Sequence, residues 1–222
     1  MDTIKKYSNI WIKIFHDAFI IGIFSMFFSG LTAFVHVLTY NNIKHIEDKK
    51  TLLLLNDIIK LESYDSTILK EKYLIKYSVL GDDLDHSLWI VRKHGRSCAI
   101  IVETTAPNGY SGMIKMLVGF DLLGNILGVR VVSHHETPGL GDYIDINISK
   151  WINVFSGMNL LNSDDHFFAI KKDGGVIDQF TGATITPRAV VSSIKNTVLF
   201  LLHSIKLHIL VDSKGNKIYV NK

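Results

Sequence analysis

The stretch Asp178-Gln179-Phe180-Thr181-Gly182-Ala183-Thr184-Ile185-Thr186-Pro187 stands directly before a long helical pattern near the end of the chain. Apolar residues then recur at helical spacing, at Val190, Val191, Ile194, Val198, Leu201, Leu202 and Ile205. We expect Thr186 to be the N-cap of this helix and Pro187 to be its first residue, because proline has no N–H that would need a partner there. The loop therefore brings threonine hydroxyls and two small residues to the start of a helix over residues 187–207.

The start of such a helix favours a phosphate group. Its unpaired N–H groups and the positive end of the helix dipole both attract anions. Gly182 and Ala183 allow a ligand to approach the backbone closely, and Thr184 can offer its own oxygen. An ordinary turn that only caps the helix is the alternative interpretation, and it leaves the hydroxyl of Thr184 and the acid at Asp178 unexplained.

Two sequence blocks resemble a known family. The pattern Asp-x-x-Thr-Gly-Ala-Thr at residues 178–184 resembles the flavinylation motif, in which a flavin transferase joins FMN to the last threonine through a phosphoester. His-Glu-Thr-Pro-Gly-Leu-Gly-Asp at residues 135–142 resembles the companion signature of FMN-binding domains in the G subunit of the Rnf (Rsx) electron-transport complex. Residues 106–112 and the pair Trp151 and Phe155 are similar to the same subunit. Thr181 stands where serine is also common in that family, and it keeps the hydroxyl.

This resemblance implies a covalent flavin site at the threonine loop. Thr184 would carry FMN, although Thr181 and Thr186 also have hydroxyls, and only the family pattern selects Thr184. Asp178 would orient the loop through contacts to its N–H groups and serve recognition by the transferase. Gly182 and Ala183 would line the cofactor-binding site together with the threonines.

The block at residues 135–142 is expected to form a wall beside the flavin. Proline followed by glycine at 138–139 favours a type II turn. Glu136 and Thr137 offer an acceptor and a hydroxyl for the polar parts of FMN, and Leu140 could pack on its ring. Tyr110 either stacks on the flavin or lies in a simple turn between strands.

The composition excludes several classes of function. The net charge is only +3, and the basic residues are scattered along the sequence. Both observations argue against a nucleic-acid partner. The single Cys98 forms no Cys-x-x-Cys motif for zinc or an iron–sulfur cluster. The sequence also shows no Ser-His-Asp arrangement and no Rossmann glycine fingerprint, so we expect no catalytic residues and no metal.

The sequence predicts four segments. Residues 1–17 form an N-terminal segment, and residues 18–40 contain no Asp, Glu, Lys or Arg over a length sufficient for a transmembrane helix. Residues 41–77 are predicted to form a helical stalk or first layer, and residues 78–222 the FMN-binding domain. Basic residues are equally frequent on both sides of the span, so charge bias gives no orientation. The resemblance implies a bacterial inner-membrane protein with a cytoplasmic N-terminal segment and its flavin domain on the periplasmic side.

The fold class is expected to be α+β. Residues 88–92, 99–104, 114–120 and 126–132 are rich in Ile and Val and predict strands, the last two joined as an antiparallel hairpin. A short helix is expected over residues 150–155, with Trp151 and Phe155 on one face. Strands followed by helices, without regular alternation, favour an antiparallel sheet with packed helices.

The resemblance implies an electron-relay subunit of a redox-driven ion-translocating oxidoreductase that connects ferredoxin and NAD. Its partners would be other membrane, iron–sulfur and flavin subunits, a flavin transferase during maturation, and the lipid bilayer. Two alternatives stay open. One is the C subunit of a sodium-pumping NADH:quinone reductase, and the other is a membrane-anchored binding or scaffold module without a redox role.

Overall fold

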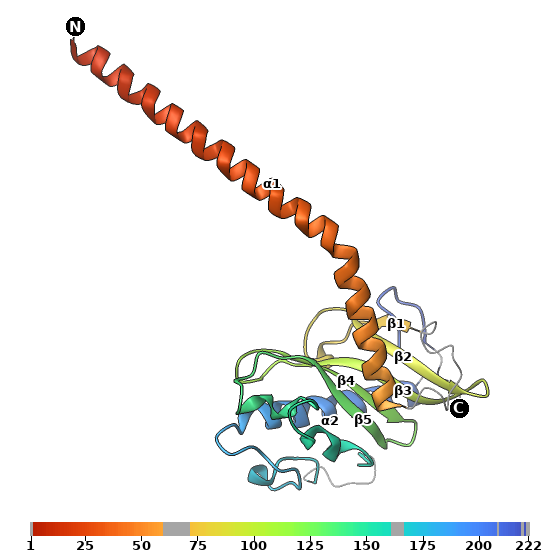
Figure 1. The fold of residues 1–222 in the computed structure, drawn as a ribbon. Helices are drawn as coiled ribbons and strands as arrows, with labels where there is room; N and C mark the ends of the chain where they lie inside the picture. Colours follow the sequence, from red (N-terminus) through yellow and green to blue (C-terminus); the bar gives the residue numbers. More distant parts are fainter. Residues whose placement is uncertain (1, 60–71, 161–166, 208, 219, 221–222) are drawn as a thin grey trace. The chain divides into compact units, whose positions relative to one another are not determined.

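The chain divides into two compact units, Met1–Lys50 and Thr51–Lys222. A computed structural model describes residues 2–59, 72–160, 167–207, 209–218 and 220 (Figure 1). Helix α1, Asp2–Ile58, forms the described part of the first unit and continues into the second.

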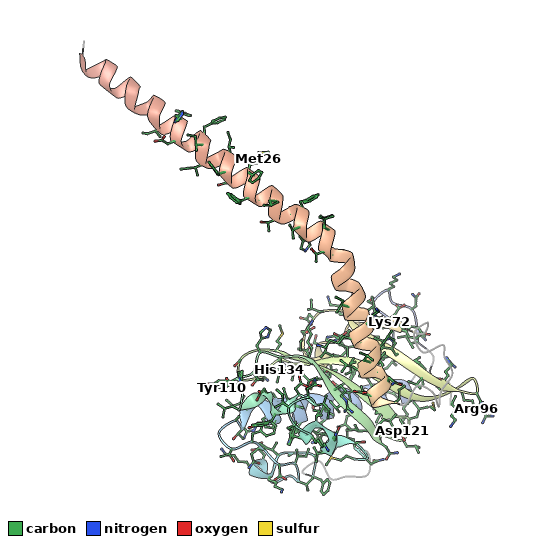
Figure 2. All side chains as sticks on the ribbon, viewed as in Figure 1. Met26, Lys72, Arg96, Tyr110, Asp121 and His134 are labelled. Carbon is green, nitrogen blue, oxygen red and sulfur yellow. The ribbon has the colours of Figure 1, made fainter. Side chains whose placement is uncertain are left out.

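The first unit contains a helical segment that is long and apolar enough to cross a membrane. The segment Ile14–Tyr40 has 27 residues and a mean hydropathy of 2.1 in its most apolar window. An α-helix rises about 1.5 Å per residue, so this length exceeds the hydrocarbon core of a bilayer, about 30 Å thick. Its large apolar side chains are exposed, and Met26 is labelled among them in Figure 2. The expected span over residues 18–40 lies within this segment.

The second unit contains a five-stranded antiparallel sheet. Its strands are β1 (Lys72–Ile75), β2 (His86–Lys93), β3 (Arg96–Ala106), β4 (Ile114–Asp121) and β5 (Ile126–Ser133). Each strand pairs with the next one along the chain, so the order in the sheet is β1-β2-β3-β4-β5. The four strands expected over residues 88–132 and the α+β class are therefore confirmed.

Both faces of this sheet are covered, which explains why its strands are almost continuously apolar. On one face, alternate residues such as Ile90, Val102 and Val118 belong to the same core as Val190 and the other buried residues of helix α2 (Ile185–Lys206). Figure 1 shows α2 beside the sheet, where it packs against β3 and β4. On the opposite face, the end of α1 packs in a second cluster: Leu55, Ile58, Ile59, Trp89, Val91, Ala99, Ile101 and Leu117.

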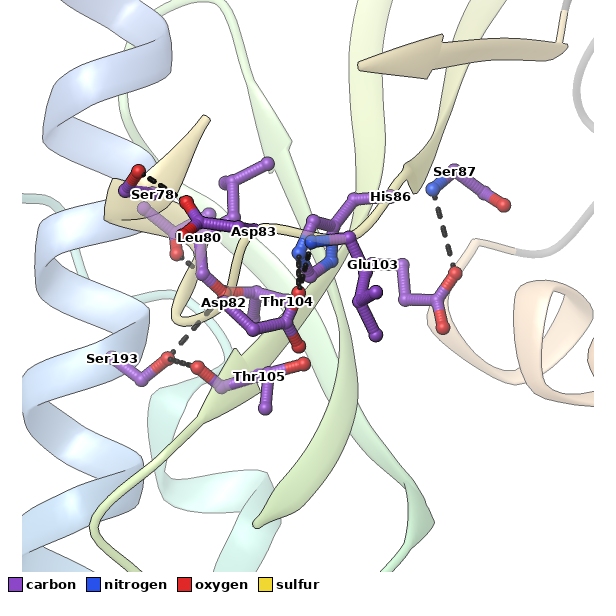
Figure 3. A network of polar contacts seen from close by, with 12 residues as sticks. Ser78, Leu80, Asp82, Asp83, His86, Ser87, Glu103, Thr104, Thr105 and Ser193 are labelled. Carbon is purple, nitrogen blue, oxygen red and sulfur yellow. Dashed lines mark hydrogen bonds and ion pairs between the residues drawn. The ribbon is translucent and has the colours of Figure 1, made fainter. Parts of the chain in front are cut away.

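A polar network ties α2 to the sheet (Figure 3). The buried hydroxyl of Thr104 on β3 donates to the carbonyl of Leu80 at 3.0 Å and lies 2.7 Å from the hydroxyl of Thr197 on α2. Ser193, one helical turn earlier, donates to the carbonyl of Thr105 at 3.1 Å. These contacts fix the position of α2, and with it the loop that precedes the helix.

The stalk expected over residues 41–77 differs from the structure. Helix α1 ends at Ile58, and Lys72–Ile75 is an edge strand that pairs with β2. The helical prediction is therefore wrong at β1, because pairing along β2 determines the conformation of this short segment. The rest of the expected stalk, residues 60–71, lies outside the described residues.

Candidate functional site

The threonine loop leads into α2 two residues earlier than expected. The helix begins at Ile185, and its N-cap is Thr184 rather than Thr186. Thr186 is instead the second helical residue and is 1% exposed. Pro187 is the third helical residue, still within the first turn, where a missing N–H costs no hydrogen bond. The expected cap is corrected because the hydroxyl of Thr186 has a different partner, the carboxylate of Glu136.

Thr184 keeps its hydroxyl available. It is partly buried, and its side chain makes no capping hydrogen bond within the described part of the chain. Its carbonyl accepts the N–H of Arg188 at 3.3 Å, so the helical ladder begins at this residue. The N–H groups of Ile185 and Thr186 have no intrahelical acceptor, because they belong to the first turn. The hydroxyl of Thr184 therefore stands beside first-turn N–H groups and the positive end of a 22-residue helix.

A tight turn precedes Thr184. The N–H of Ala183 donates to the carbonyl of Phe180 at 3.2 Å, and Gly182 has a φ of +81°. A positive φ at the third position is characteristic of a type II turn and favours glycine. Thr181 and Gly182 are exposed at the tip, and Ala183 is half-buried.

The turn at residues 137–140 lies against the threonine loop. The carbonyl of Thr137 accepts the N–H of Leu140 at 3.2 Å, and Gly139 has a φ of +75°, as the Pro-Gly pair predicted. A Cβ placed on Gly182 would lie 3.7 Å from Cδ2 of Leu140. Leu140 is 44% exposed, and Ile185 at the start of α2 is 47% exposed. An apolar surface thus adjoins the phosphate-favouring helix start.

Glu136 is placed differently from the expected ligand wall. It is buried, and its carboxylate accepts the hydroxyl of Thr186 and the main-chain N–H of Ser111, the latter at 3.0 Å. Its own N–H donates to Nδ1 of His134 at 3.2 Å. Glu136 therefore joins three segments that are distant in sequence: the loop at residues 109–112, the loop after β5 and the start of α2.

Two ion pairs involve residues at the ends of the threonine loop: Asp178 pairs with Lys171, and Arg188 pairs with Asp173. Asp178 is exposed and lies 2.6 Å from Nζ of Lys171, so the structure shows this ion pair in place of the expected contacts to loop N–H groups. Arg188 donates to both carboxylate oxygens of Asp173, at 2.6 and 2.8 Å. Hydrogen bonding to Arg188 lowers the pKa of Asp173, and the same bond raises the pKa of Arg188. Each of these two cations near the loop is therefore paired with a carboxylate.

Tyr110 and Thr137 are exposed, and their contacts with FMN stay predictions from the sequence. Tyr110, labelled in Figure 2, is 68% exposed and belongs to the loop that Ser111 ties to Glu136. Two relationships bring expected site residues together: the hydrogen bond between Thr186 and Glu136, and the closeness of Leu140 to Gly182.

The threonine loop packs on a cluster of aromatic rings that the sequence alone did not connect to it. The ring of Phe180 lies 5.0 Å from that of Trp151 and 5.4 Å from that of Tyr143. Trp151 also packs edge-on against Phe155 at 5.4 Å, within the 3₁₀ helix η4 (Trp151–Phe155). The expected short helix with both rings on one face is therefore present. The sequence did contain one signal of this packing: Phe180 is an aromatic residue among the small and polar residues of the loop.

These residues fit a flavin mononucleotide. Its phosphate suits the free donors at the start of α2, and its aromatic ring suits the apolar side chains of Leu140 and Ile185. The side chain of Thr184, the N-cap of α2, makes no capping hydrogen bond beside these donors.

Comparison with known proteins agrees with this fit. Residues 109–198 match the family described as FMN-binding domain. The chain is 51% identical over 181 residues to the G subunit of the ion-translocating oxidoreductase complex of Yersinia pestis, an alignment that covers 82% of this chain and 87% of the relative. The protein of the same name from Photorhabdus laumondii gives the same identity and coverage. The one from Buchnera aphidicola subsp. Baizongia pistaciae is 45% identical over 190 residues, covering 85% of this chain and 88% of the relative.

Proposed function

Because this chain belongs to the family of G subunits of Rnf-type ion-translocating oxidoreductase complexes, we propose that it is an electron-relay subunit with FMN esterified to Thr184. Its FMN-binding domain and apolar N-terminal helix make it a membrane-anchored flavoprotein of a redox-driven translocase. The family resemblance and the geometry of the threonine loop support the covalent bond at Thr184.

The observation that carries the proposal is the state of the Thr184 hydroxyl. Three threonines stand close together, but Thr186 donates to Glu136 and Thr181 lies at the tip of the preceding turn. Thr184 alone of these combines the N-cap position with a hydroxyl that makes no capping bond in the described structure. Ester formation requires an activated flavin donor, a phosphoric anhydride of FMN. The Thr184 oxygen forms the new O–P bond, the anhydride P–O bond breaks, and the leaving phosphate group departs with the bonding electron pair while the hydroxyl proton is released.

The protein's part in electron transfer is to position and retain the cofactor. FMN, when bound, supplies reversible uptake of one or two electrons. The first-turn N–H groups of α2 would hold the phosphate, while Leu140 and Ile185 would shield part of the ring from water. A covalent link keeps the carrier from diffusing away between its electron donor and acceptor.

We propose further that the complex connects ferredoxin and NAD, and that a flavin transferase attaches the FMN. The other partners would be membrane, iron–sulfur and flavin subunits and the lipid bilayer. The flavin domain would lie on the periplasmic side of the bacterial inner membrane, where a transferase of this type would reach Thr184. The family resemblance supports this orientation, and a C-terminal alkaline phosphatase fusion tests it, because that reporter is active only outside the cytoplasm.

Denaturing gel fluorescence tests the attachment. The full chain is co-expressed with an active flavin transferase, as wild type, Thr184→Val and the control Ser192→Ala, which removes an exposed hydroxyl of α2 outside the threonine loop. We expect flavin fluorescence that survives denaturation in wild type and in Ser192→Ala and is absent in Thr184→Val. Peptide mass mapping should place one FMN ester on the segment that contains Thr184.

A wild-type mass equal to that of the bare polypeptide would reject the covalent carrier and favour an anchored scaffold module. Fluorescence retained in Thr184→Val, with the FMN ester mapped to another residue, would move the attachment to that hydroxyl.

A further inference from the structure

Glu136 is a buried acidic residue that the proposed electron relay does not use directly. It is 4% exposed, and both of its carboxylate oxygens accept hydrogen bonds. Oε1 accepts the main-chain N–H of Ser111 at 3.0 Å, and Oε2 accepts the hydroxyl of Thr186. Thr186 is 50 positions away in sequence and Ser111 is 25 positions away. A carboxylate with such partners holds a tertiary arrangement together.

Two glycines allow the backbone to enclose this carboxylate. A Cβ on Gly109 would lie 2.9 Å from Oε1 of Glu136 and 2.2 Å from the carbonyl oxygen of Gly112. A Cβ on Gly141 would lie 2.7 Å from Oε2 and 2.9 Å from Oγ1 of Thr186. Any side chain there would displace the carboxylate or the backbone. This enclosure argues against direct contact between Glu136 and a ligand.

The contact to Thr186 reaches the proposed attachment site. Thr186 lies two residues after Thr184, in the first turn of α2. Fixing its hydroxyl fixes the orientation of that turn, and with it the direction of the free N–H groups. The negative charge of Glu136 beside the turn also interacts favourably with the positive end of the helix.

We propose that Glu136 is a positioning residue: through Thr186 it holds the first turn of α2 in the orientation at which Thr184 accepts its flavin. This inference rests on the proposed attachment at Thr184. Because Glu136 also binds the N–H of Ser111, docking of the loop at residues 109–112 and presentation of Thr184 depend on the same carboxylate.

The experiment compares flavin attachment and local exchange in the full chain. The variants are Glu136→Ala, Glu136→Gln, Thr186→Val and Thr186→Ser. The control is Glu103→Gln, because Glu103 lies on β3 and accepts the N–H of Ser87 instead. Each is co-expressed with an active flavin transferase, and flavin per protein is followed over time. Hydrogen exchange of residues 107–114 and 182–190 is measured by mass spectrometry in detergent, on protein made without the transferase.

We expect Glu136→Ala and Thr186→Val each to slow attachment by about tenfold, because each removes a hydrogen bond to a buried charged group. Glu136→Gln should fall between Ala and wild type, and Thr186→Ser should restore the wild-type rate. The double variant Glu136→Ala/Thr186→Val should be no slower than the slower single variant, since both changes remove one shared contact. Exchange in both segments should be about tenfold faster in Glu136→Ala, whereas Glu103→Gln should resemble wild type.

The outcomes separate this inference from the proposed function. Absence of flavin from wild type overturns both. Flavin on wild-type Thr184, together with wild-type attachment rates in Glu136→Ala and Thr186→Val, overturns only the role of Glu136. Unchanged exchange at residues 182–190 in Glu136→Ala also overturns it. If Glu136→Ala fails to fold, Thr186→Val and its rescue by Thr186→Ser decide the question.

Discussion

The indole N–H of Trp151 donates a hydrogen bond of 2.7 Å to the main-chain carbonyl of Asp178. This bond connects η4 to Asp178, the first residue of the threonine loop, 27 positions later in the sequence. The ring of Trp151 also lies between those of Phe155 and Phe180, at 5.4 and 5.0 Å. The position of the threonine loop therefore depends on a residue outside the motif.

Trp151→Phe should weaken the loop without removing its aromatic support. Losing one hydrogen bond costs about 1 kcal/mol, which lowers the Tm of a domain of this size by about 2–4 °C. Trp151→Ala also removes the ring contacts and should cost about 3 kcal/mol. Thermal unfolding of the full chain in detergent, followed by circular dichroism, measures both. Equal losses in the two variants would show that the hydrogen bond, and not the ring, carries the stability.

Gly182 should resist substitution by residues that avoid positive φ. Its φ of +81° disfavours a Cβ, although the nearest atom to such a Cβ, on Leu140, would be at an ordinary contact distance of 3.7 Å. Gly182→Ala should therefore cost about 1 kcal/mol. Gly182→Asn should cost less, because asparagine adopts left-handed conformations more readily. Thermal unfolding compares the two, and a larger loss for Asn would indicate that space rather than backbone conformation limits this position.

Asp82 should make the domain less stable at acidic pH than at neutral pH (Figure 3). Burial raises the pKa of its carboxyl, but hydrogen bonds from the N–H of Leu84, the side chain of Thr105 and His86 outweigh burial and hold the pKa below 3.8. The lowered pKa means that Asp82 stabilises the fold above its unfolded-state pKa. This stabilisation is lost as the pH falls through the folded-state pKa.

The variant Asp82→Asn checks this expectation. It should be less stable than wild type at neutral pH, and the difference should shrink as the pH falls below about 4. Thermal unfolding between neutral and acidic pH gives the two curves. Asp83→Asn is a matched control, because Asp83 is exposed and accepts a hydrogen bond from the Ser78 hydroxyl instead. Parallel curves for wild type and Asp82→Asn would contradict the assignment.

Local sequence patterns predicted most of the sheet and α2, since buried strands are rich in Ile and Val and a helix buried on one face shows helical periodicity. They did not predict β1, because four residues carry too little pattern and their conformation depends on pairing with β2. Thr186 is a good cap by residue type, yet its hydroxyl binds Glu136, a partner that only the tertiary fold brings near. The sequence indicated Glu136 as a ligand contact because its tertiary partners are distant in sequence. The structure encloses its carboxylate between Gly109 and Gly141.

Gly119 and Gly128 face each other across β4 and β5 and leave room for Ile58 at the end of α1. A Cβ on Gly119 would lie 2.3 Å from Cγ2 of Ile58, whereas a Cβ on Gly128 would lie 3.4 Å from the nearest atom, Cα of Ile58. Gly119→Ala should therefore cost about 2 kcal/mol through overpacking, and Gly128→Ala is the matched control with a smaller loss.

Ile58→Ala identifies the contact. This change removes the atom that the new Cβ would meet, so Gly119→Ala should cost much less in an Ile58→Ala background than in wild type. Four thermal unfolding curves, for wild type, the two single variants and the double variant, complete the cycle. Additive losses would mean that α1 does not end against Gly119. A strong coupling would show that the end of the N-terminal helix is part of the core of the flavin domain.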